Sequence, residues 1–329
     1  VLMNPPFGDV SSGSKTYVFK TFPVSKADVY AVFVERGLQL LRSGGQLGAI
    51  TSRTGFYLTS LRNWRELLIK VAPITSFVDL GLGVLDSAMV EASCFTASKQ
   101  ENSVNAAFIN CIKAKEKDQD LFQALLDKRI KWLDVKKFDA IPDSPFSYWA
   151  PTELVDLFAS NDPFSASGFR VCQGLGSSDN FRFLRLWWEV KPEAIGFNLR
   201  WSPYAKGGGY RPHWGDQELL VLWQNDGHEI KEFSSSLYGT WSKQITNVDF
   251  YGRPGLTYSS RTSSDFAPRI FFAGSAFDTK GSCVFDVLGP DKPERLAKAL
   301  VVLQSPTFRN LLNLCVATSG DTARSYTEA

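Results

Sequence analysis

Hydrophobic positions over residues 1–112 follow two spacings. Short apolar runs predict strands, and apolar residues that recur every three or four positions predict helices. The predicted strands are residues 1–3, 46–51, 74–80, 90–97 and 105–112, the last of them at a sheet edge or in a hairpin. The predicted helices are residues 27–42 and 61–71. This alternation predicts an α/β fold with a mainly parallel, doubly wound sheet.

The pattern changes along the rest of the chain. Residues 113–165 turn polar and helical, which predicts a helical linker. Residues 166–290 carry short apolar runs crowded with Gly, Trp, Tyr, Arg and Asn, which predicts a second, mixed and β-rich domain. Residues 291–329 return to helical spacing. We predict that this last segment is helical and that the chain's end cuts it short.

Composition places few limits on function. The 329 residues suffice for two domains, and a hydrophobic fraction of 44% is ordinary for a protein with a core. A net charge of +2 neither shows nor excludes a local basic patch. The five cysteines are scattered without a CxxC pair, which predicts reduced thiols in a cytoplasm and no metal site. No apolar run reaches the roughly 18 residues of a membrane span.

Both ends of the chain resemble cuts through a longer protein. The sequence begins with Val1 and a short apolar run, and it stops soon after a predicted helix without a polar tail. We therefore expect a fragment of a larger protein. The alternative is a processed or tagged polypeptide.

The loop after the first predicted strand reads Asn4-Pro5-Pro6-Phe7. The Asn4 side-chain oxygen and the Pro5 carbonyl are two acceptors that suit the two hydrogens of an exocyclic amine such as adenine N6. The prolines fix φ, so the Pro5 carbonyl is aimed before a ligand binds. Phe7 can stack on a base that has been flipped out of a duplex. We therefore predict that Asn4, Pro5, Pro6 and Phe7 are catalytic.

A plain turn is the alternative interpretation of this loop, because Asn-Pro and Pro-Pro are common loop dipeptides. The position of the loop decides between them. It follows an apolar strand end and precedes an alternation of helices and strands, and parallel sheets bind ligands in the loops at the carboxyl ends of their strands. This context favours the catalytic interpretation.

These four residues resemble the catalytic motif of the adenine-N6 DNA methyltransferases. Other segments resemble the large type II and BREX-type phage-defence members of that family. They are residues 77–86, 88–91, 174–185, 187–190, 203–208, 211–214, 225–227, 255–259, 277–282 and 323–326. The resemblance covers nearly the whole chain, but only the Asn4–Phe7 motif is specific for the reaction.

The resemblance implies the C-terminal part of a Rossmann-like methyltransferase sheet, followed by a DNA target-recognition domain. It also implies methyl transfer from S-adenosylmethionine to adenine N6 of a flipped-out base, in restriction-modification or BREX-type phage defence. The partners it implies are double-stranded DNA and other phage-defence subunits, with no membrane, in a prokaryotic cytoplasm. The family's glycine-rich cofactor turn precedes the Asn-Pro-Pro-Phe motif, so we expect the cofactor site upstream of Val1. Gly81-Leu82-Gly83 is a weak substitute because no helix pattern follows it.

The second half offers cations between flexible glycines and aromatic residues. Lysine and arginine neutralise phosphates, and arginine also reads guanine. The predicted DNA-binding residues are Lys206, Tyr210, Arg211, His213, Arg253, Arg261 and Lys280, with Arg269 as a further candidate. The alternative for each is that aromatic rings fill a small core while arginines decorate the surface. His228 follows an Asp-Gly turn signal and is predicted to lie in a surface loop.

Three functions stay open from the sequence. The first is methyl transfer to DNA adenine, the second is a DNA specificity module without chemistry, and the third is methylation of an RNA or protein amine. The long region rich in Trp and Arg favours duplex DNA. No hydrolase triad or nuclease signature is present in the sequence, so we predict no cleavage activity.

Overall fold

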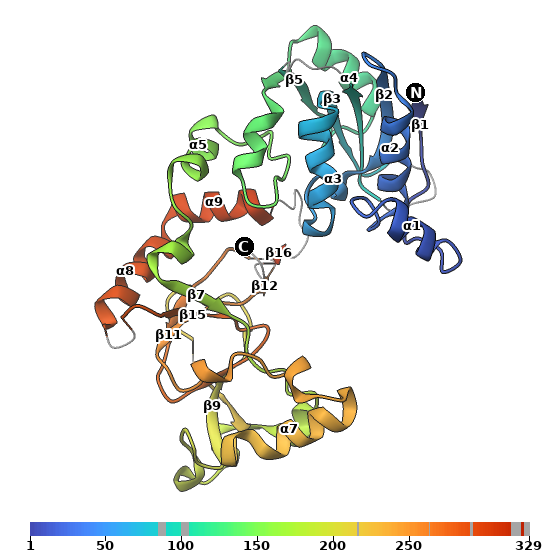
Figure 1. Ribbon diagram of the computed structural model, residues 1–329. Helices are drawn as coiled ribbons and strands as arrows, with labels where there is room; N and C mark the ends of the chain where they lie inside the picture. The colour runs from blue at the N-terminus through green and yellow to red at the C-terminus, as the bar shows by residue number, and fades with distance from the viewer. Residues whose placement is uncertain are drawn as a thin grey trace. The chain divides into compact units, whose positions relative to one another are not determined.

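The computed structural model describes residues 1–84, 90–99, 105–215, 217–262, 264–289, 292–316 and 324–325. The chain divides into two compact units, Val1–Asn161 and Asp162–Ala329. In Figure 1 the first unit runs from blue to green and the second from green through yellow to red. Within the described residues, no helix is long and apolar enough to cross a membrane.

The first unit contains a six-stranded sheet in the order β1-β2-β4-β3-β5-β6. Its strands are β1 (Leu2–Met3), β2 (Gln46–Ser52), β3 (Ile74–Gly81), β4 (Ala92–Ser98), β5 (Ala106–Asn110) and β6 (Lys131–Leu133). Strands β1 and β2 are parallel, as are β3 and β5, whereas β4 runs antiparallel to both β2 and β3. Four strands therefore share one direction, and their carboxyl ends lie at one edge of the sheet.

The sheet contains parallel and antiparallel strand pairs, which corrects the prediction of a mainly parallel sheet. Only residues 82–91 connect β3 to β4, which is too short for a helical crossover between parallel strands. The two strands therefore pair as antiparallel neighbours. β4 then lies between β2 and β3 and hydrogen-bonds to both of them.

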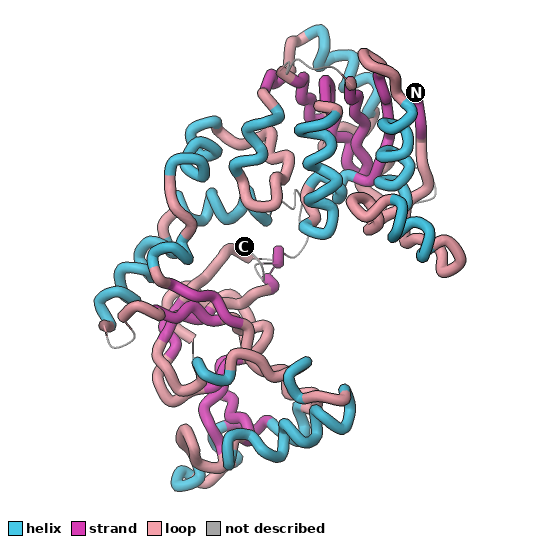
Figure 2. Tube along the Cα trace, in the orientation of Figure 1, coloured by secondary structure: helices cyan, strands magenta, loops and turns pink. Residues whose placement is uncertain are grey.

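The α-helices of the first unit are α1 (Lys15–Thr21), α2 (Val29–Leu40), α3 (Arg62–Glu66, continued as one π turn, Leu67–Val71), α4 (Lys117–Leu126) and α5 (Thr152–Ser160). Of these, α2 and α4 cover opposite faces of the sheet. On one face, Gly37 of α2 lies so close to β1 and β2 that an added Cβ would come within 2.6 Å of Met3 and Leu47. On the other face, Ala124 of α4 packs with Val78 and Ile109. The order of elements can be followed in Figures 1 and 2.

Residues 113–161 pack with the first sheet and do not form a separate linker. β6 pairs with β5, and the ring of Phe138 lies 5.7 Å from Phe108 and stacks on Phe146 at 5.1 Å. Tyr148 stacks on Phe108 with a centroid distance of 5.4 Å. The sequence prediction of a helical linker missed this packing because the apolar residues that carry it lie between the helices, without helical spacing.

The second unit contains two four-stranded sheets and one strand pair, in the orders β14-β9-β10-β8, β13-β11-β15-β7 and β12-β16. The strands are β7 (Phe169–Cys172), β8 (Leu184–Leu186), β9 (Trp201–Ala205), β10 (Leu219–Leu222), β11 (Gly255–Thr257), β12 (Arg261–Thr262), β13 (Arg269–Phe271), β14 (Ala276–Phe277), β15 (Cys283–Asp286) and β16 (Arg324–Ser325). This agrees with the predicted β-rich texture of the second half.

Four α-helices of the described residues accompany these sheets, α6 (Asn180–Phe183), α7 (Gln224–Tyr238), α8 (Pro293–Gln304) and α9 (Pro306–Val316). Residues 225–227 adopt positive φ before α7 becomes regular, so the predicted Asn-Asp-Gly turn forms at its start. The prediction that His228 lies in a loop was wrong, because the residue belongs to α7, although its side chain is exposed beside Glu232. Leu303 and Leu312, from α8 and α9, pack with Leu256 and Val284 of the second sheet.

A buried polar junction joins β9 and β14 in the first of these sheets. The Tyr204 hydroxyl lies 2.6 Å from Asp278 Oδ2 and 2.9 Å from the Leu175 carbonyl, and both Tyr204 and Asp278 are buried. Asp278 Oδ1 also accepts from the Lys280 N–H at 2.6 Å. Burial, with the nearby charge of Asp278, raises the pKa of Tyr204, so its hydroxyl stays a donor. Each polar group therefore has a partner.

Tyr204→Phe should lower the free energy of unfolding of the second unit by about 1–3 kcal/mol, because it leaves the buried Asp278 carboxylate short of a donor. Chemical denaturation followed by tryptophan fluorescence measures this. Tyr210→Phe is the matched control, since Tyr210 is 47% exposed and should change stability little. Equal losses in the two variants would contradict the assignment.

Candidate functional site

The Asn4–Phe7 loop begins where β1 ends, at the edge formed by the carboxyl ends of β1, β2, β3 and β5. Asn4 and Pro6 are exposed, Pro5 is buried and Phe7 is half-buried. The structure thus places the predicted catalytic residues together, at the kind of edge where α/β sheets bind ligands. Burial of Pro5 and exposure of Asn4 fix the backbone while leaving the carboxamide accessible.

Asp28 fastens the far end of this loop to helix α2. Its Oδ1 accepts from the Gly8 N–H at 3.0 Å and from the Tyr30 N–H at 3.2 Å, and the Val29 N–H donates to the Gly8 carbonyl at 3.0 Å. Asp28 is the N-cap of α2, a position that favours Asp because its side chain accepts from an otherwise unpaired helix N–H. Burial raises the pKa of Asp28, and the backbone donors from Gly8 and Tyr30 oppose that shift. One carboxylate therefore serves both the helix and the loop.

An aromatic chain holds the Phe7 ring. Phe7 meets Tyr30 edge to face at 5.8 Å and 87°, and Tyr30 meets the buried Trp64 at 5.8 Å and 81°. Trp64 contacts Phe56 at 5.2 Å, and Phe56 contacts Phe77 on β3 at 4.8 Å. Edge-to-face pairs of this kind stabilise a defined ring orientation. The half-exposed ring of Phe7 is thus connected to the core of the sheet.

The two predicted acceptors of the motif have no hydrogen-bond donor among the described residues. Within the described residues, nothing hydrogen-bonds to the Asn4 carboxamide, and no backbone N–H donates to the Pro5 carbonyl. Oxygen atoms without an internal partner can accept from a ligand at no loss of an existing bond. The loop is therefore suited to receive a group with two N–H donors.

A buried ion pair ties neighbouring elements together at the same edge. Arg53, just after β2, donates from Nε to Asp79 Oδ1 of β3 at 2.5 Å, and both side chains are nearly inaccessible. The Tyr148 hydroxyl donates to Asp79 Oδ2 at 3.0 Å, and Glu91, just before β4, lies 3.3 Å from Arg53 Nη1. Burial and the Asp79 charge raise the pKa of Tyr148, which keeps it a donor. The ends of β2 and β3 and the start of β4 are therefore linked.

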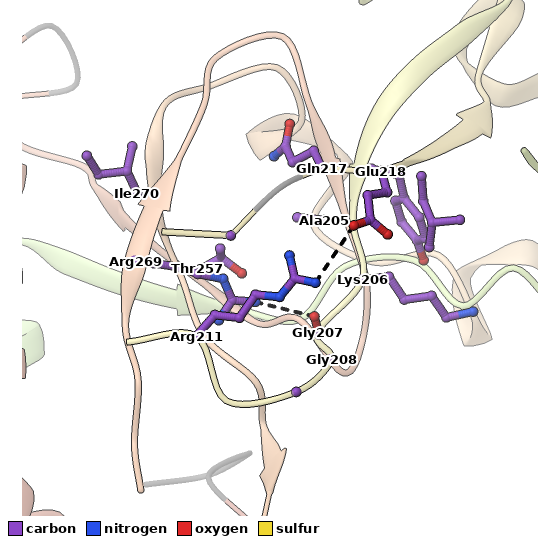
Figure 3. Close-up of a pocket in the computed structure, with 14 residues that line it drawn as sticks. Ala205, Lys206, Gly207, Gly208, Arg211, Gln217, Glu218, Thr257, Arg269 and Ile270 are labelled. Atoms are coloured by element: carbon purple, nitrogen blue, oxygen red, sulfur yellow. Dashed lines mark hydrogen bonds and ion pairs between the residues drawn. The ribbon is translucent and has the colours of Figure 1, made fainter. Parts of the chain in front are cut away.

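A pocket in the second unit brings two of the predicted DNA-binding residues together. Lys206 and Arg211 line a cavity of about 180 Å³, together with Gly207, Gly208 and Arg269 (Figure 3). Lys206 Nζ donates to Asn180 at 2.8 Å, and Arg211 lies 3.8 Å from Glu218. The exposed Tyr210 and Lys280 adjoin this wall, since Tyr210 precedes Arg211 and the Lys280 carbonyl lies against Gly207.

The other predicted DNA-binding residues are exposed outside the pocket lining. His213 is exposed in the loop before β10. Arg253 stacks its guanidinium over the Phe250 ring at 5.1 Å, and Arg261 lies on β12 opposite Ser325. The structure therefore does not gather all seven candidates at one place. Their contacts with DNA stay predictions.

The structural roles of several residues at these sites were not predicted from the sequence. Asp28 carries an N-cap signal ahead of a helix, which could have identified the cap but not its bond to Gly8. Arg53 and Asp79 lie 26 positions apart, and no local pattern pairs them. Arg269 was one arginine among several candidates, and its burial at 5% exposure was unexpected.

The sequence offered the Gly81-Leu82-Gly83 segment as a weak substitute for a cofactor turn, and it offered no metal site. Gly81 ends β3 with φ +69°, and residues 82–84 after it form bends, not a helix. Residues 85–89, part of the resemblance noted for 77–86 and 88–91, lie outside the described residues, as do 323 and 326. In the described part of the chain, no three His, Cys, Asp or Glu side chains gather closely enough to hold a metal ion.

Part of the chain that forms this edge of the sheet is similar to a known protein family. Residues 1–84 match the Eco57I restriction-modification methylase family. The match covers the Asn4–Phe7 loop, Asp28, Tyr30, Arg53 and Asp79. It therefore includes every residue of the first candidate site except Glu91 and Tyr148.

Two relatives extend the similarity along the chain. The chain is 27% identical over 304 residues to the adenine-specific methyltransferase PglX of Lacticaseibacillus casei (strain Zhang), which covers 86% of this chain and 25% of that protein. It is 28% identical over 300 residues to the adenine-specific methyltransferase BrxX of Escherichia coli O9:H4 (strain HS), covering 87% of this chain and 24% of the relative. The chain thus spans about a quarter of each relative's length. The predicted resemblance to adenine-specific methyltransferases is confirmed.

A solved structure agrees with the fold. The type IIL restriction-modification enzyme MmeI, solved in complex with DNA, matches with a TM-score of 0.58 and 13% identity over 99% of this chain and 44% of that chain. At this identity the likeness shows the fold alone. The predicted fold class, a Rossmann-like α/β part followed by a β-rich region, is confirmed.

Asp79→Asn should destabilise the first unit by about 3–5 kcal/mol, because it leaves the buried Arg53 guanidinium without its closest counter-charge. Denaturant unfolding monitored by circular dichroism measures the change. Asp156→Asn is the matched control, because Asp156 pairs with Lys137 at 3.8 Å on the surface, where such a pair contributes about 0–1 kcal/mol. If Asp79→Asn costs no more than its control, the pair does not hold this edge.

Asp28→Ala should free the Gly8 N–H and the first turn of α2, with a loss of about 1 kcal/mol in stability. Hydrogen exchange by mass spectrometry should show faster exchange in the peptide that contains Gly8. Asp134→Ala is the control, since Asp134 also caps a helix by accepting from the N–H two residues later, at 3.0 Å from Lys136. Asp28→Asn, which keeps the Oδ1 acceptor, should retain most of the protection. Unchanged exchange in Asp28→Ala would refute the anchoring role.

Proposed function

We propose that this chain carries the target-base half of a DNA adenine-N6 methyltransferase, joined to a DNA-recognition region. The observation that supports this most is the pair of unpartnered acceptors, Asn4 Oδ1 and the Pro5 carbonyl, at the end of β1. Residues 1–84 match a methylase family, and the two relatives are named adenine-specific methyltransferases. Both relatives are about four times as long as this chain, so the proposal extends the activity of a longer protein to this part of it.

The chemistry of adenine N6 requires acceptors at this place. The N6 lone pair is delocalised into the ring, so the nitrogen attacks poorly while it stays planar. Hydrogen bonds from its two N–H groups to Asn4 and Pro5 favour a pyramidal nitrogen whose lone pair is available. Because Pro5 is buried and Asp28 holds Gly8, these acceptors keep their positions before the base arrives.

Methyl transfer forms an N–C bond to N6 while the S–C bond of the sulfonium breaks, so a neutral thioether leaves and the nitrogen becomes positively charged. That nitrogen then releases one of its protons, so no strong general base is needed. S-adenosylmethionine supplies the methyl group on a positively charged sulfur when it is bound. The described residues carry no glycine-rich turn between a strand and a helix, so we place the main cofactor contacts outside this chain.

Phe7 accounts for the recognition of a base that has left its duplex. N6 lies within the double helix, so an enzyme must extrude the nucleotide and compensate for its lost stacking. The half-exposed Phe7 ring, fixed edge to face by Tyr30, offers one aromatic surface for that purpose. Stacking of a base on an aromatic side chain is worth about 1–3 kcal/mol.

The second unit carries exposed or pocket-lining cations that suit contact with double-stranded DNA. Lys206 and Arg211 line its pocket, and Arg253 and Arg261 are exposed elsewhere on it. A long second region rich in Trp and Arg favours DNA over a protein amine as the substrate, because a protein methyltransferase needs no region of that kind. By resemblance, the biological setting is restriction-modification or BREX-type phage defence.

Asn4→Ala should lower methyl transfer by at least about 100-fold, because it removes one of two preorganised acceptors. The assay uses labelled S-adenosylmethionine and unmethylated plasmid DNA, with this chain and with the chain extended upstream. The labelled product is digested to nucleosides to identify N6-methyladenine. Asn63→Ala is the control, since Asn63 is exposed on α3.

Three outcomes distinguish the candidate functions. Label on adenine that depends on Asn4 but not on Asn63 supports the proposal. If the extended chain binds DNA with high affinity but transfers no label, the chain is a DNA specificity module without catalysis. Label on RNA or protein in place of DNA would assign it to another amine.

A further inference from the structure

The pocket of the second unit contains a buried arginine without a counter-ion. Arg269, at the start of β13, is 5% exposed. Within the described residues, no carboxylate lies within ion-pair distance of it, and its two hydrogen bonds go to the carbonyls of Ala267 and Gly207 at 3.4 and 3.3 Å. A guanidinium has five N–H donors, so most of its capacity is unused.

Another buried arginine in the same chain shows what a satisfied guanidinium looks like. Arg65, in the first unit, is also buried with no carboxylate within ion-pair distance among the described residues, yet it donates to the carbonyls of Gly55, Leu58 and Asp143 at 2.7–3.1 Å. Four short bonds replace the water that Arg65 loses on folding. Arg269 has two long ones, so its desolvation is poorly compensated. Its charge is available to a ligand.

A second cation faces the same space. Figure 3 shows the guanidinium groups of Arg211 and Arg269 close to each other beside the Gly207–Gly208 backbone. Burial lowers the pKa of Arg269, and among the nearby charges Arg211 lowers it further. Glu218 pairs with Arg211 at 3.8 Å, but both side chains are more than 40% exposed, so their attraction is weakened by water.

The glycine loop that forms the pocket wall is rigidly placed. Gly207 and Gly208 have φ of +33° and +113°, and a Cβ on Gly207 would come within 2.6 Å of the Lys280 carbonyl. The Ser259 hydroxyl donates to the Gly208 carbonyl at 2.9 Å. A Cβ on Gly215 would come within 2.6 Å of Arg269 Nε. Glycine at positions 207 and 215 therefore leaves room for the Lys280 carbonyl and for the Arg269 guanidinium.

We infer that this pocket, built by Gly207, Gly208, Arg211 and Arg269, binds a phosphate group of the DNA backbone. The unused donors of Arg269 and the positive charge of Arg211 match the oxygens of a phosphate, and arginine–phosphate pairs are strong, charge-assisted contacts. The inference rests on the proposed function for the source of the phosphate. The pocket itself requires only an anion.

Neighbouring aromatic rings favour a nucleic acid over a free phosphate. Trp214 and Phe272 adjoin Gly215 and β13, their rings lie 5.1 Å apart, and they are 56% and 39% exposed. Exposed aromatic side chains beside cations are typical of surfaces that bind nucleic acids. A backbone phosphate in the pocket would bring sugars and bases next to these rings.

The first measurement is the thermal unfolding of the 329-residue chain in inorganic phosphate, with chloride at equal ionic strength as the reference. Phosphate should raise the Tm of the second unit by roughly 3 °C more in the wild type than in Arg269→Met. Glu218→Gln should increase the phosphate effect, because it removes a carboxylate that competes for Arg211. Without phosphate, Arg269→Met should be at least as stable as the wild type, since it removes a poorly compensated buried charge.

The second measurement is the binding of the same variants to a labelled DNA duplex at several salt concentrations. Arg269→Met should weaken binding roughly tenfold on any sequence and reduce the slope of log K against log salt by about 0.9, the change expected for one phosphate. Arg170→Met is the control, because Arg170 is an exposed arginine of β7 that stacks on Phe250 outside the pocket. It should change affinity by less than about twofold.

The two measurements separate the possible failures. If phosphate stabilises the wild type and Arg269→Met equally, the pocket is no anion site and the inference is overturned. If the phosphate effect depends on Arg269 but DNA affinity does not, the pocket binds a free anion and the DNA assignment is overturned. If the chain binds no DNA while the phosphate effect persists, the proposed DNA recognition fails and the anion site stands. Loss of affinity on one sequence only would indicate base reading in place of phosphate binding.

Discussion

The buried ion pair between Arg53 and Asp79 is the constraint on which the edge of the first sheet depends. Two charges removed from water need a close partner and further hydrogen bonds to offset their desolvation. Tyr148 and Glu91 supply further contacts from two other segments of the chain, although Arg53 Nη2 is buried without a hydrogen-bond partner among the described residues. The ends of β2 and β3, the start of β4 and the segment after β6 therefore hold one another in position.

This arrangement bears on the Asn4–Phe7 loop, which lies at the same edge. The loop's own local bonds are weaker than the ion pair, since an N-cap such as Asp28 contributes about 1 kcal/mol. A loop held by such small contributions keeps a fixed geometry only on a rigid support. The sheet edge and the aromatic chain from Phe7 through Tyr30 to Trp64 give that support. Acceptors held in this way need little reorganisation when a base enters.

Much of the first unit could be predicted from local sequence patterns. The strands around residues 46–52 and 74–81 and the helix around 29–40 follow apolar spacing closely. The Asn-Pro-Pro-Phe motif was found because its four residues are adjacent and follow a strand. The antiparallel insertion of β4 was not predicted, because periodicity identifies a strand without giving its neighbours or its direction.

The second unit was less predictable for a related reason. Its strands are two to five residues long, so few of them contain enough positions to show a period. The Tyr204–Asp278 junction joins residues 74 positions apart. Arginine is usually exposed, so nothing in the sequence separates the buried Arg269 from the exposed Arg253 and Arg261.

Three buried arginines illustrate how one physical rule separates structure from function in this chain. Arg53 is neutralised by Asp79, although its Nη2 atom is buried without a hydrogen-bond partner among the described residues. Arg65 is solvated by short bonds to backbone carbonyls. Each of these two charges therefore has close partners within the fold. Arg269 has only two long bonds to carbonyls. Its burial lowers stability without a matching contact among the described residues. A buried charge that lowers stability is retained where a ligand provides the missing interaction. Because Arg211 and Arg269 are two neighbouring guanidinium groups, that ligand is an anion.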